Sequence, residues 1–303
     1  MTAELALGTY RCRAIPEAAA RAAASGARWI DTAPNYAAGR AQDLLAPVLA
    51  AHPSLRVSTK AGYFTGATGT DAVNAGVLTE DQAAAGHSLA PDYVRWQVRR
   101  NREQLGRERL DLVMLHNPER AHPGDRLALH QAMRAAFVVL EEEVAAGNVA
   151  GYGVATWAGL EEEAFTVGEL LALAAEAAGG QHHRLVAVQL PVSLVMMTLI
   201  VQALDGRGPL PAAVGAGLRV VASAPLHGGE LPGMVDQELA DLIRPGLTPA
   251  QACLLTVASC PGVTDVLNAA SSTPHWRDAA EAVAQPSLTA AKLREITHVL
   301  ASP

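Results

Sequence analysis

The chain has 303 residues, of which 50% are apolar and 17% are charged, and it carries a net charge of −7. This composition supports a large buried core and excludes a wholly disordered chain, while the length suits one α/β barrel of about 250 residues. We therefore expect a single domain over residues 1–303. Because the sequence contains no basic block, nucleic acid and an anionic membrane surface are excluded as main partners, and a small molecule is favoured.

Short apolar runs alternate with longer amphipathic stretches from one end of the chain to the other. Strands are predicted over residues 5–8, 28–31, 56–60, 110–116, 151–155, 186–190, 219–223 and 263–267. Helices are predicted over residues 16–25, 40–51, 91–105, 127–146, 161–178, 210–216, 248–258, 274–284 and 289–301. This alternation predicts parallel strands, and their number predicts closure into an α/β fold of the (β/α)8 TIM barrel type.

Two connections between the predicted elements are long, residues 61–90 and 226–247. Both leave the C-terminal end of a strand, where the active sites of such barrels lie. They are therefore candidate lids or walls of a ligand pocket, and the first contains Tyr63, Phe64 and His87. The acidic run 161–163 is predicted to form the first turn of a helix and to complement its dipole.

The sequence favours a cytoplasmic protein without a metal. The first residues lack the charged and apolar regions of a signal peptide, and no apolar run is long enough for a transmembrane helix. The three cysteines form no CxxC pair, which suits a reducing compartment. His182 and His183 have no suitably spaced acidic or cysteine partner, so no metal site is expected.

Titratable residues stand at or just after the ends of three consecutive predicted strands. Asp31 ends the second strand and Tyr36 follows it, Lys60 ends the third strand, and His116 ends the fourth. Taken singly, each has a structural interpretation: a loop cap, a rim aromatic, an ion pair or a satisfied strand-end histidine. Lys60 is one of only two lysines in the chain, which suggests that an ammonium group is specifically required. Together they favour an acid/base site.

The chemistry of this set points to proton transfer through the phenol of Tyr36. A tyrosine has an ordinary pKa of about 10, and a neighbouring ammonium group favours the phenolate and lowers that value. The phenol would then donate a proton to a developing alkoxide, while His116 orients a carbonyl group by hydrogen bonding.

These motifs, in this order, resemble the aldo-keto reductase superfamily over essentially the whole chain. The resemblance rests on residues 31–36, 59–60, 115–119, 151–154 and 224–226, together with Gln189. It implies Tyr36 as general acid, Lys60 as modulator of its pKa, His116 as substrate orienter and Asp31 as the partner of Lys60. It also implies NADPH as the source of hydride.

The resemblance further implies a set of binding residues. Those expected for the cofactor are Gly8, Thr9, Thr156, Gln189, Ser223, Pro225, Leu226, Gly229, Ser271, Ser272 and Arg277. The expected substrate pocket contains Tyr10, Phe64 and Trp157.

The cofactor side departs from the family pattern in three ways. Ser223 stands where an aromatic residue usually stacks on the nicotinamide, and Ala155 and Thr156 replace the pair that holds the carboxamide. Residues 270–273 contain no lysine or arginine that could bind the 2′-phosphate of NADPH, and Arg277 is the residue expected to bind it instead. We therefore expect NADPH binding to be weak or absent relative to ordinary members of the family.

Two enzymatic hypotheses follow, beside a non-catalytic binding barrel. The first is an NADPH-dependent carbonyl reductase or alcohol dehydrogenase that acts on a small organic substrate. The second keeps the same residues but uses Tyr36 and Lys60 for elimination, isomerisation or cyclisation without a cofactor. The four residues serve proton transfer in either mechanism, so the sequence keeps both open. Oligomeric state has no signal in the sequence.

Overall fold

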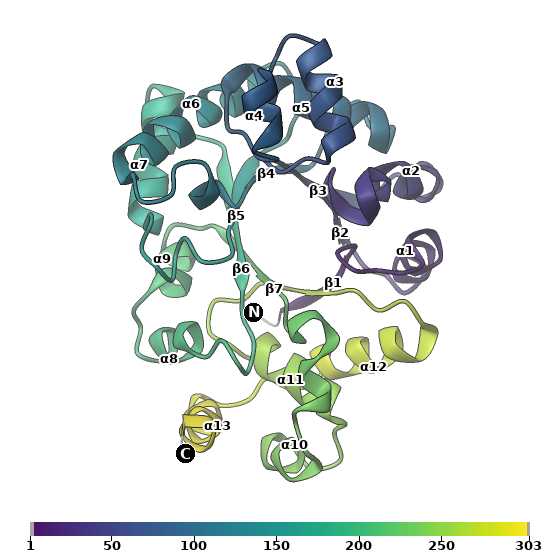
Figure 1. Cartoon of the computed structure of the whole chain (residues 1–303). Coiled ribbons are helices and arrows are strands. Elements are labelled where there is room, and N and C mark those ends of the chain that lie inside the picture. The colour runs from purple at the N-terminus through teal and green to yellow at the C-terminus, as the bar shows by residue number, and fades with distance from the viewer. Residues whose placement is uncertain (1–2, 302–303) are drawn as a thin grey trace.

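A computed structural model describes residues 3–301, which form a closed barrel of parallel strands. Each strand pairs with the next, and β8 pairs with β1, which closes the barrel. The strands are β1 (Glu4–Gly8), β2 (Trp29–Asp31), β3 (Arg56–Ala61), β4 (Leu112–His116), β5 (Tyr152–Ala155), β6 (Leu185–Pro191), β7 (Arg219–Ser223) and β8 (Asp265–Asn268). The (β/α)8 barrel predicted from the sequence is confirmed (Figure 1).

Helices form a ring outside the strands (Figure 1). The α-helices are α1 (Ile15–Ala24), α2 (Ala41–Ala51), α3 (Gly66–Asn74), α4 (Glu80–Ala84), α5 (Pro91–Leu105), α6 (Arg126–Ala145), α7 (Val167–Ala178), α8 (Thr198–Leu204), α9 (Pro209–Gly215), α10 (Gln237–Ile243), α11 (Pro249–Ala258), α12 (Thr273–Val283) and α13 (Ala290–Ala301). Short 3-10 turns are η1 (Tyr36–Gly39), η2 (Pro118–Arg120), η3 (His227–Gly229) and η4 (Leu231–Gly233). No helix within residues 3–301 is long and apolar enough to cross a membrane.

The barrel is packed on both sides of its wall. Inside it, one cluster of buried side chains comprises Ala6, Leu112, Met114, Ala155, Ala187, Val221 and Leu267. A larger cluster lies between the strands and the surrounding helices. Because the interior is filled with side chains, the barrel is a packed core rather than a pore, and in barrels of this kind the active sites lie at the loops of the C-terminal rim.

The N-terminal ends of the strands carry a second group of contacting side chains. Trp29 at the start of β2 lies under the guanidinium group of Arg219 at the start of β7, with 4.4 Å from the Arg219 Cζ atom to the ring centre. Arg219 also pairs with the buried carboxylate of Asp265. This contact lies at the N-terminal ends of the strands, opposite the rim that their C-terminal ends form.

Helix α7 begins later than the sequence predicts. Thr166 and Glu169 form a capping box, in which the Thr166 hydroxyl accepts from the Glu169 N–H and the Glu169 carboxylate accepts from the Thr166 N–H. These reciprocal bonds satisfy free N–H groups, so the helix begins at Val167. Glu163 instead has φ of +54°, so the prediction that residues 161–163 form the first helical turn is wrong.

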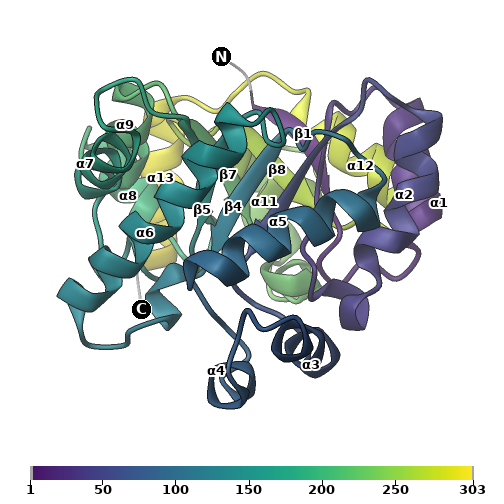
Figure 2. The same cartoon turned by 90° about the horizontal axis from the view of Figure 1, so that it is seen from above.

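The long connection after β3 contains helices α3 and α4, which stand out beyond α5 in Figure 2. A separate cluster of buried side chains anchors them to α5: Phe64, Ala72, Leu78, Tyr93 and Trp96. The connection is therefore held by apolar packing rather than left as an open loop.

Candidate active site

Three consecutive strands deliver three of the titratable side chains to one end of the barrel. Asp31 ends β2, Lys60 lies one residue before the end of β3, and His116 ends β4. Tyr36 begins the 3-10 turn η1, and its ring lies 5.0 Å from the Lys60 ammonium and 5.9 Å from the His116 ring. The structure thus brings together the four residues that the sequence proposed as a catalytic set.

Lys60 and Asp31 form a buried ion pair. The Lys60 Nζ donates to the Asp31 Oδ1 at 2.6 Å and to the Thr32 carbonyl oxygen at 2.9 Å. Ser58 donates its hydroxyl to the other carboxylate oxygen of Asp31. With side-chain exposures of 1% for Lys60 and 4% for Asp31, these charges are screened little by water. Burial is the largest single influence on Lys60 and opposes its charge, but the combined interactions with Asp31 and Tyr36 outweigh burial and raise the pKa of Lys60.

The phenol of Tyr36 lies in an environment that keeps it protonated. Burial raises the pKa of Tyr36, and this effect outweighs the opposing influence of the Lys60 ammonium. The expectation of a pKa below the ordinary value is therefore wrong, because the sequence did not reveal how deeply the phenol is buried. At neutral pH the group is a neutral proton donor whose acidity Lys60 increases and burial decreases.

His116 is packed edge-on between two tyrosine rings. Its ring lies 5.0 Å from the Tyr63 ring, and Tyr63 in turn contacts His87. A ring nitrogen of His87, Nε2, lies 2.8 Å from the carbonyl oxygen of His116. Burial, together with the nearby Lys60 charge, holds the pKa of His116 well below its usual range. His116 is therefore neutral at physiological pH, and its Nδ1 has no hydrogen-bond partner within residues 3–301.

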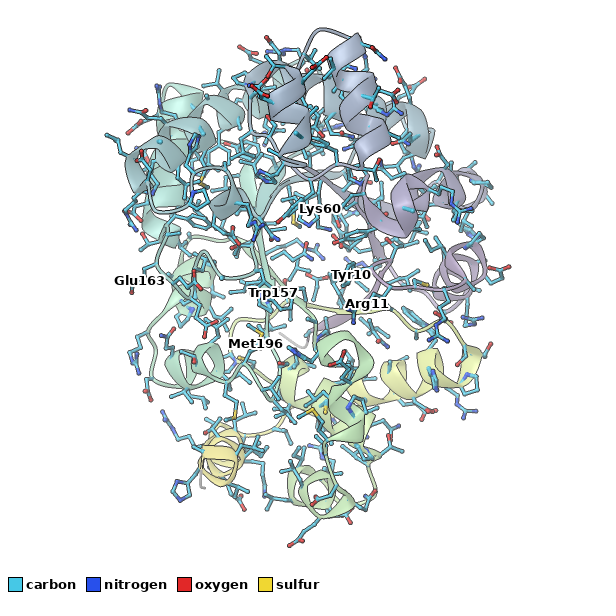
Figure 3. The ribbon with its side chains drawn as sticks, viewed as in Figure 1. Tyr10, Arg11, Lys60, Trp157, Glu163 and Met196 are labelled. Carbon is cyan, nitrogen blue, oxygen red and sulfur yellow. The ribbon has the colours of Figure 1, made fainter. Side chains whose placement is uncertain are left out.

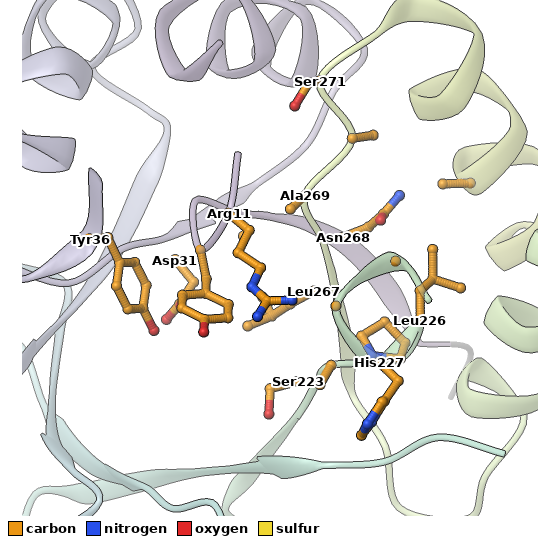
Figure 4. Close-up of a pocket in the computed structure, with 18 of the residues that line it drawn as sticks. Arg11, Asp31, Tyr36, Ser223, Leu226, His227, Leu267, Asn268, Ala269 and Ser271 are labelled. Atoms are coloured by element: carbon orange, nitrogen blue, oxygen red, sulfur yellow. The ribbon is translucent and has the colours of Figure 1, made fainter. Parts of the chain in front are cut away.

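An elongated cavity of about 1260 Å³ extends from Lys60 and Tyr36 to the first turns of α12. This volume exceeds the roughly 300–1,000 Å³ of ordinary ligand pockets. Figure 4 shows Tyr36 and Asp31 on one side of this cavity, and Asn268 and Ser271 on another. A ligand of more than one ring system could therefore lie with one end at the phenol and the other at α12.

Most residues that the sequence assigned to ligand binding line this cavity. They are Gly8, Tyr10, Thr156, Trp157, Gln189, Ser223, Pro225, Leu226, Gly229, Ser271 and Ser272. In Figure 3, Tyr10 and Trp157 lie over the middle of the barrel near Lys60.

Three of the assigned residues do not line the cavity. Thr9 turns its hydroxyl to Thr32 within the barrel wall. Phe64 packs against Tyr93 in the cluster beneath α3, because the chain between β3 and α5 folds into helices that need an apolar anchor. Arg277 lies 69% exposed on the outer face of α12, where it pairs with neighbouring acidic side chains. These three assignments are corrected accordingly.

Of the first long connection, Tyr63 lines the cavity, whereas His87 supports His116 from behind. The second long connection supplies Leu226 to Glu230 and Pro232. The Arg11 guanidinium group reaches across from the loop after β1 and lies 3.8 Å from the Glu230 carboxylate (Figure 4). The second connection therefore forms a pocket wall as expected, whereas the first contributes mainly one ring.

Arg11 and Arg13 are cavity-lining cations that the sequence reasoning missed. The Arg13 backbone N–H donates to the Ser271 hydroxyl at 3.1 Å, which ties the loop after β1 to the segment before α12. The Arg13 side chain is exposed and has no acidic partner among the described residues. The available signal was the Arg-Cys-Arg run that begins three residues after the end of the first strand.

Trp157 is held in place by a carboxylate from a neighbouring loop. Glu119 in η2 accepts hydrogen bonds from the backbone N–H groups of Trp157 and Ala158. The half-exposed indole of Trp157 is thereby fixed at the rim of the cavity.

Among residues 3–301, no cluster of His, Cys, Asp and Glu could hold a metal ion.

Comparison with known proteins adds three findings. The model of the aldo/keto reductase family matches residues 12–300. A D-threo-aldose 1-dehydrogenase from Pseudomonas sp is 31% identical over 138 residues, which are 43% of this chain and 40% of that protein. The chain thus aligns with less than half the length of this relative.

The third finding is a solved structure. An aldo/keto reductase from Klebsiella pneumoniae in complex with NADP and acetate superposes with a TM-score of 0.68 and 18% identity. The superposition covers 99% of this chain and 92% of that one. At this level of identity the likeness shows the fold.

Proposed function

Because this chain belongs to the aldo/keto reductase family, we propose that it interconverts a carbonyl group and an alcohol on a small organic substrate with NADPH as cofactor. The observation that carries the proposal is the buried Lys60–Asp31 ion pair beside the Tyr36 phenol at one end of the long cavity. The pairing of β1 with β8 also supports the proposal that the whole chain acts as one domain.

The cavity offers polar groups that fit a nicotinamide dinucleotide. Gln189 lines the cavity, and its buried Oε1 has no hydrogen-bond partner within residues 3–301, so it needs a donor such as a carboxamide N–H. Ser271, Ser272 and Arg13 line the far end, where they would hold phosphate oxygens. These residues therefore fit the cofactor.

Other features of the cavity favour weak binding. Ser223 has no aromatic ring that could stack on the nicotinamide. Stacking between aromatic rings contributes about 0.5–1.5 kcal/mol beyond the burial of their surface. The Thr156 hydroxyl already accepts from the Gly159 N–H at 2.8 Å. Arg277 does not line the cavity, and Arg13 is the cation that we propose for the 2′-phosphate in its place. The expectation of weakened NADPH affinity stays a prediction.

When bound, NADPH supplies a hydride to the carbonyl carbon of the substrate. The C=O double bond becomes a C–O single bond, and Tyr36 donates its proton to the oxygen so that the product is a neutral alcohol. The Lys60 ammonium stabilises the phenolate that remains, and Asp31 keeps that ammonium charged and in place. Neutral His116 orients the carbonyl oxygen by hydrogen bonding. Alcohol oxidation reverses these proton transfers.

Aldoses are the first substrates to test. The curated relative is named for an aldose, although the match covers 40% of that protein. The cavity near Tyr36 combines the rings of Tyr10 and Trp157 with the side-chain amides of Asn35 and Asn117. Apolar surfaces combined with a few polar groups suit a hydroxylated ring.

The decisive experiment separates cofactor binding from chemistry. Quenching of tryptophan fluorescence should show binding of NADPH or NADH. We expect this binding to be two to three decades weaker than at a site that has the stacking aromatic, the carboxamide-binding pair and the 2′-phosphate cation, at about 1.4 kcal/mol per decade. Oxidation of the reduced nicotinamide on addition of an aldose or aldehyde supports the proposal. No binding at about millimolar NADPH or NADH rejects it. Tyr36 and Lys60 would then form a cofactor-free acid/base pair, which is the second hypothesis from the sequence.

A further inference from the structure

A connected group of buried polar side chains lies outside the barrel wall, between β3, α2 and α5. It consists of Gln42, Thr59, Tyr93, Gln97 and Asn101, each with 0% exposure. Burying amide and hydroxyl groups costs free energy unless every group finds a partner. Apolar side chains of similar size would fill the same space without that requirement. The cost suggests that the group has a task other than packing.

Tyr93, Gln97 and Asn101 follow one another at intervals of four residues along α5. This spacing places them on one face of the helix, towards β3 and α2. The Tyr93 hydroxyl donates to the Gln97 Oε1 at 2.8 Å, and the Gln97 Nε2 donates to the Asn101 Oδ1 at 2.7 Å.

A second branch reaches Asn101 from the strand and from α2. The Thr59 hydroxyl donates to the Gln42 Oε1 at 2.8 Å, and the Gln42 Nε2 donates to the same Asn101 Oδ1 at 2.9 Å. Asn101 therefore receives two hydrogen bonds on its oxygen. Its Nδ2 donates to the carbonyl oxygen of Lys60 at 2.9 Å.

The direction of these hydrogen bonds is fixed by chemistry. The carbonyl oxygen of Lys60 can only accept, so the Asn101 amide nitrogen must face it and the Asn101 oxygen must accept from both glutamines. Each glutamine then turns its own oxygen to a hydroxyl group, which donates to it. The two hydroxyl groups thus complete the network by satisfying the glutamine oxygens.

The Lys60 carbonyl oxygen belongs to the same residue whose ammonium meets Asp31 and Thr32 inside the barrel. We propose that Asn101 is a positioning residue that fixes the backbone of Lys60, so that the ammonium stays beside the Tyr36 phenol. Gln42 and Gln97 donate to the Asn101 oxygen and hold its amide towards Lys60, and their own oxygens accept from Thr59 and Tyr93. This inference rests on the proposed function of Tyr36 and Lys60.

Asn101→Leu is the direct test, because leucine has a similar size and no donor. A displacement of about 1 Å at a catalytic group can cost about a hundredfold in rate, so we expect kcat to fall about tenfold to a hundredfold. The NADPH dissociation constant should change less than about twofold, since no cavity-lining residue is altered. The groups that face the Lys60 ammonium are Asp31, Tyr36 and His116, and the pH profile of kcat should shift as their geometry changes.

The chain offers a matched control within the same network. Gln104 accepts from the Gln42 Nε2 at 2.9 Å but lies at the partly exposed edge and makes no bond to Asn101. Gln104→Ala removes a hydrogen bond of the same kind and should leave kcat and its pH profile unchanged. Equal losses in Asn101→Leu and Gln104→Ala would overturn the proposal.

A second measurement does not depend on activity. Lys60 and Lys292 are the only lysines in the chain, so selective ¹³Cε labelling of lysine gives one NMR signal for each. Lys292 pairs with Glu295 far from the network and serves as an internal reference. In Asn101→Leu the Lys60 signal should move or broaden while the Lys292 signal stays. This result can be obtained even if the wild type shows no turnover, which would reject the proposed function alone.

Asn101→Leu could fail to fold, so a gentler variant completes the test. Thr59→Val combined with Tyr93→Phe keeps Asn101 and nearly the same side-chain shapes at positions 59 and 93, but it removes the two hydroxyl groups that donate to Gln42 and Gln97. We expect the Lys60 signal to move and kcat to fall by less than in Asn101→Leu. If the double variant leaves both unchanged while lowering only the thermal midpoint, the network is structural and the proposal is wrong.

Discussion

The two ends of the cavity are built differently. At one end, Lys60 and Asp31 are almost fully buried and each charge has its partner. At the other end, the polar groups come from loops and helix ends, and Ser271, Ser272 and Arg13 are partly or largely exposed. The first end lies on adjacent strands of the closed sheet, whereas the second depends on how the loop after β1 meets the segment before α12.

The difference fits the role that we propose for each end. Proton transfer requires fixed charges in a site from which water is excluded, and a rigid strand end supplies that. A phosphate group can be bound by a cation or N–H group from several directions, so the residue that supplies it can change. Under the proposed function, the end at Lys60 and Asp31 therefore depends on particular residue types, while the end at α12 needs only a cation or N–H group, whichever element supplies it.

The largest expected effect tests the acid/base end. Tyr36→Phe removes the proton donor without altering the ion pair behind it, so turnover should fall about 10²- to 10⁴-fold. Steady-state kinetics with an aldose or aldehyde measures the loss, and NADPH titration should give an unchanged dissociation constant. Tyr63→Phe, which changes another phenol at the same cavity, is the matched control and should retain most activity. A Tyr36→Phe enzyme with half of the wild-type activity would contradict the role.

A smaller effect is expected at the nucleotide end. Arg13→Ala should weaken NADPH binding about tenfold, because an exposed charge-assisted hydrogen bond contributes on the order of 1.5 kcal/mol. NADH binding should change little if Arg13 contacts the 2′-phosphate. Arg277→Ala serves as the control, since that side chain does not line the cavity and should have no effect on either cofactor. Fluorescence titration of both variants decides between the two arginines, and the reverse result would restore the assignment made from sequence.

The smallest expected effect is the loss of folding stability at acidic pH, which we attribute to buried histidines near Lys60 and Tyr36. Burial lowers the pKa values of His87 and His116 below the ordinary 6.5. Below that pH the unfolded chain binds protons that the folded chain does not, so stability is lost as the pH falls. The slope approaches about 1.4 kcal/mol per pH unit for each histidine.

Thermal midpoints measured from about pH 7.5 to about pH 5 test this linkage. His87→Gln should lose less stability over that range than the wild type, because one of the two buried histidines is gone. His275→Gln, at an exposed histidine, should behave like the wild type. If His87→Gln shows the same acid sensitivity as the wild type, His87 does not carry this effect.

The amino-acid sequence by itself determined the barrel, the family and the grouping of Asp31, Tyr36, Lys60 and His116 at one end. These features follow from local chain order, because parallel strands in a barrel bring consecutive strand ends to the same rim. The family match over residues 12–300 confirms the resemblance that these motifs indicated. The catalytic and binding roles of the residues stay predictions.

Tertiary structure decided what depends on burial and on contacts between distant elements. The pKa of Tyr36 is raised rather than lowered because the phenol is buried, which no motif reveals. Phe64 lies away from the cavity because α3 packs on α5, and Arg277 does not line it because its side chain pairs with acidic neighbours on α12. Asn101 reaches the Lys60 carbonyl from 41 residues away, so packing alone brings it to the site. Such contacts join segments that lie far apart in the sequence, and no local sequence pattern indicates that they meet. Only the folded structure shows which of them are in contact.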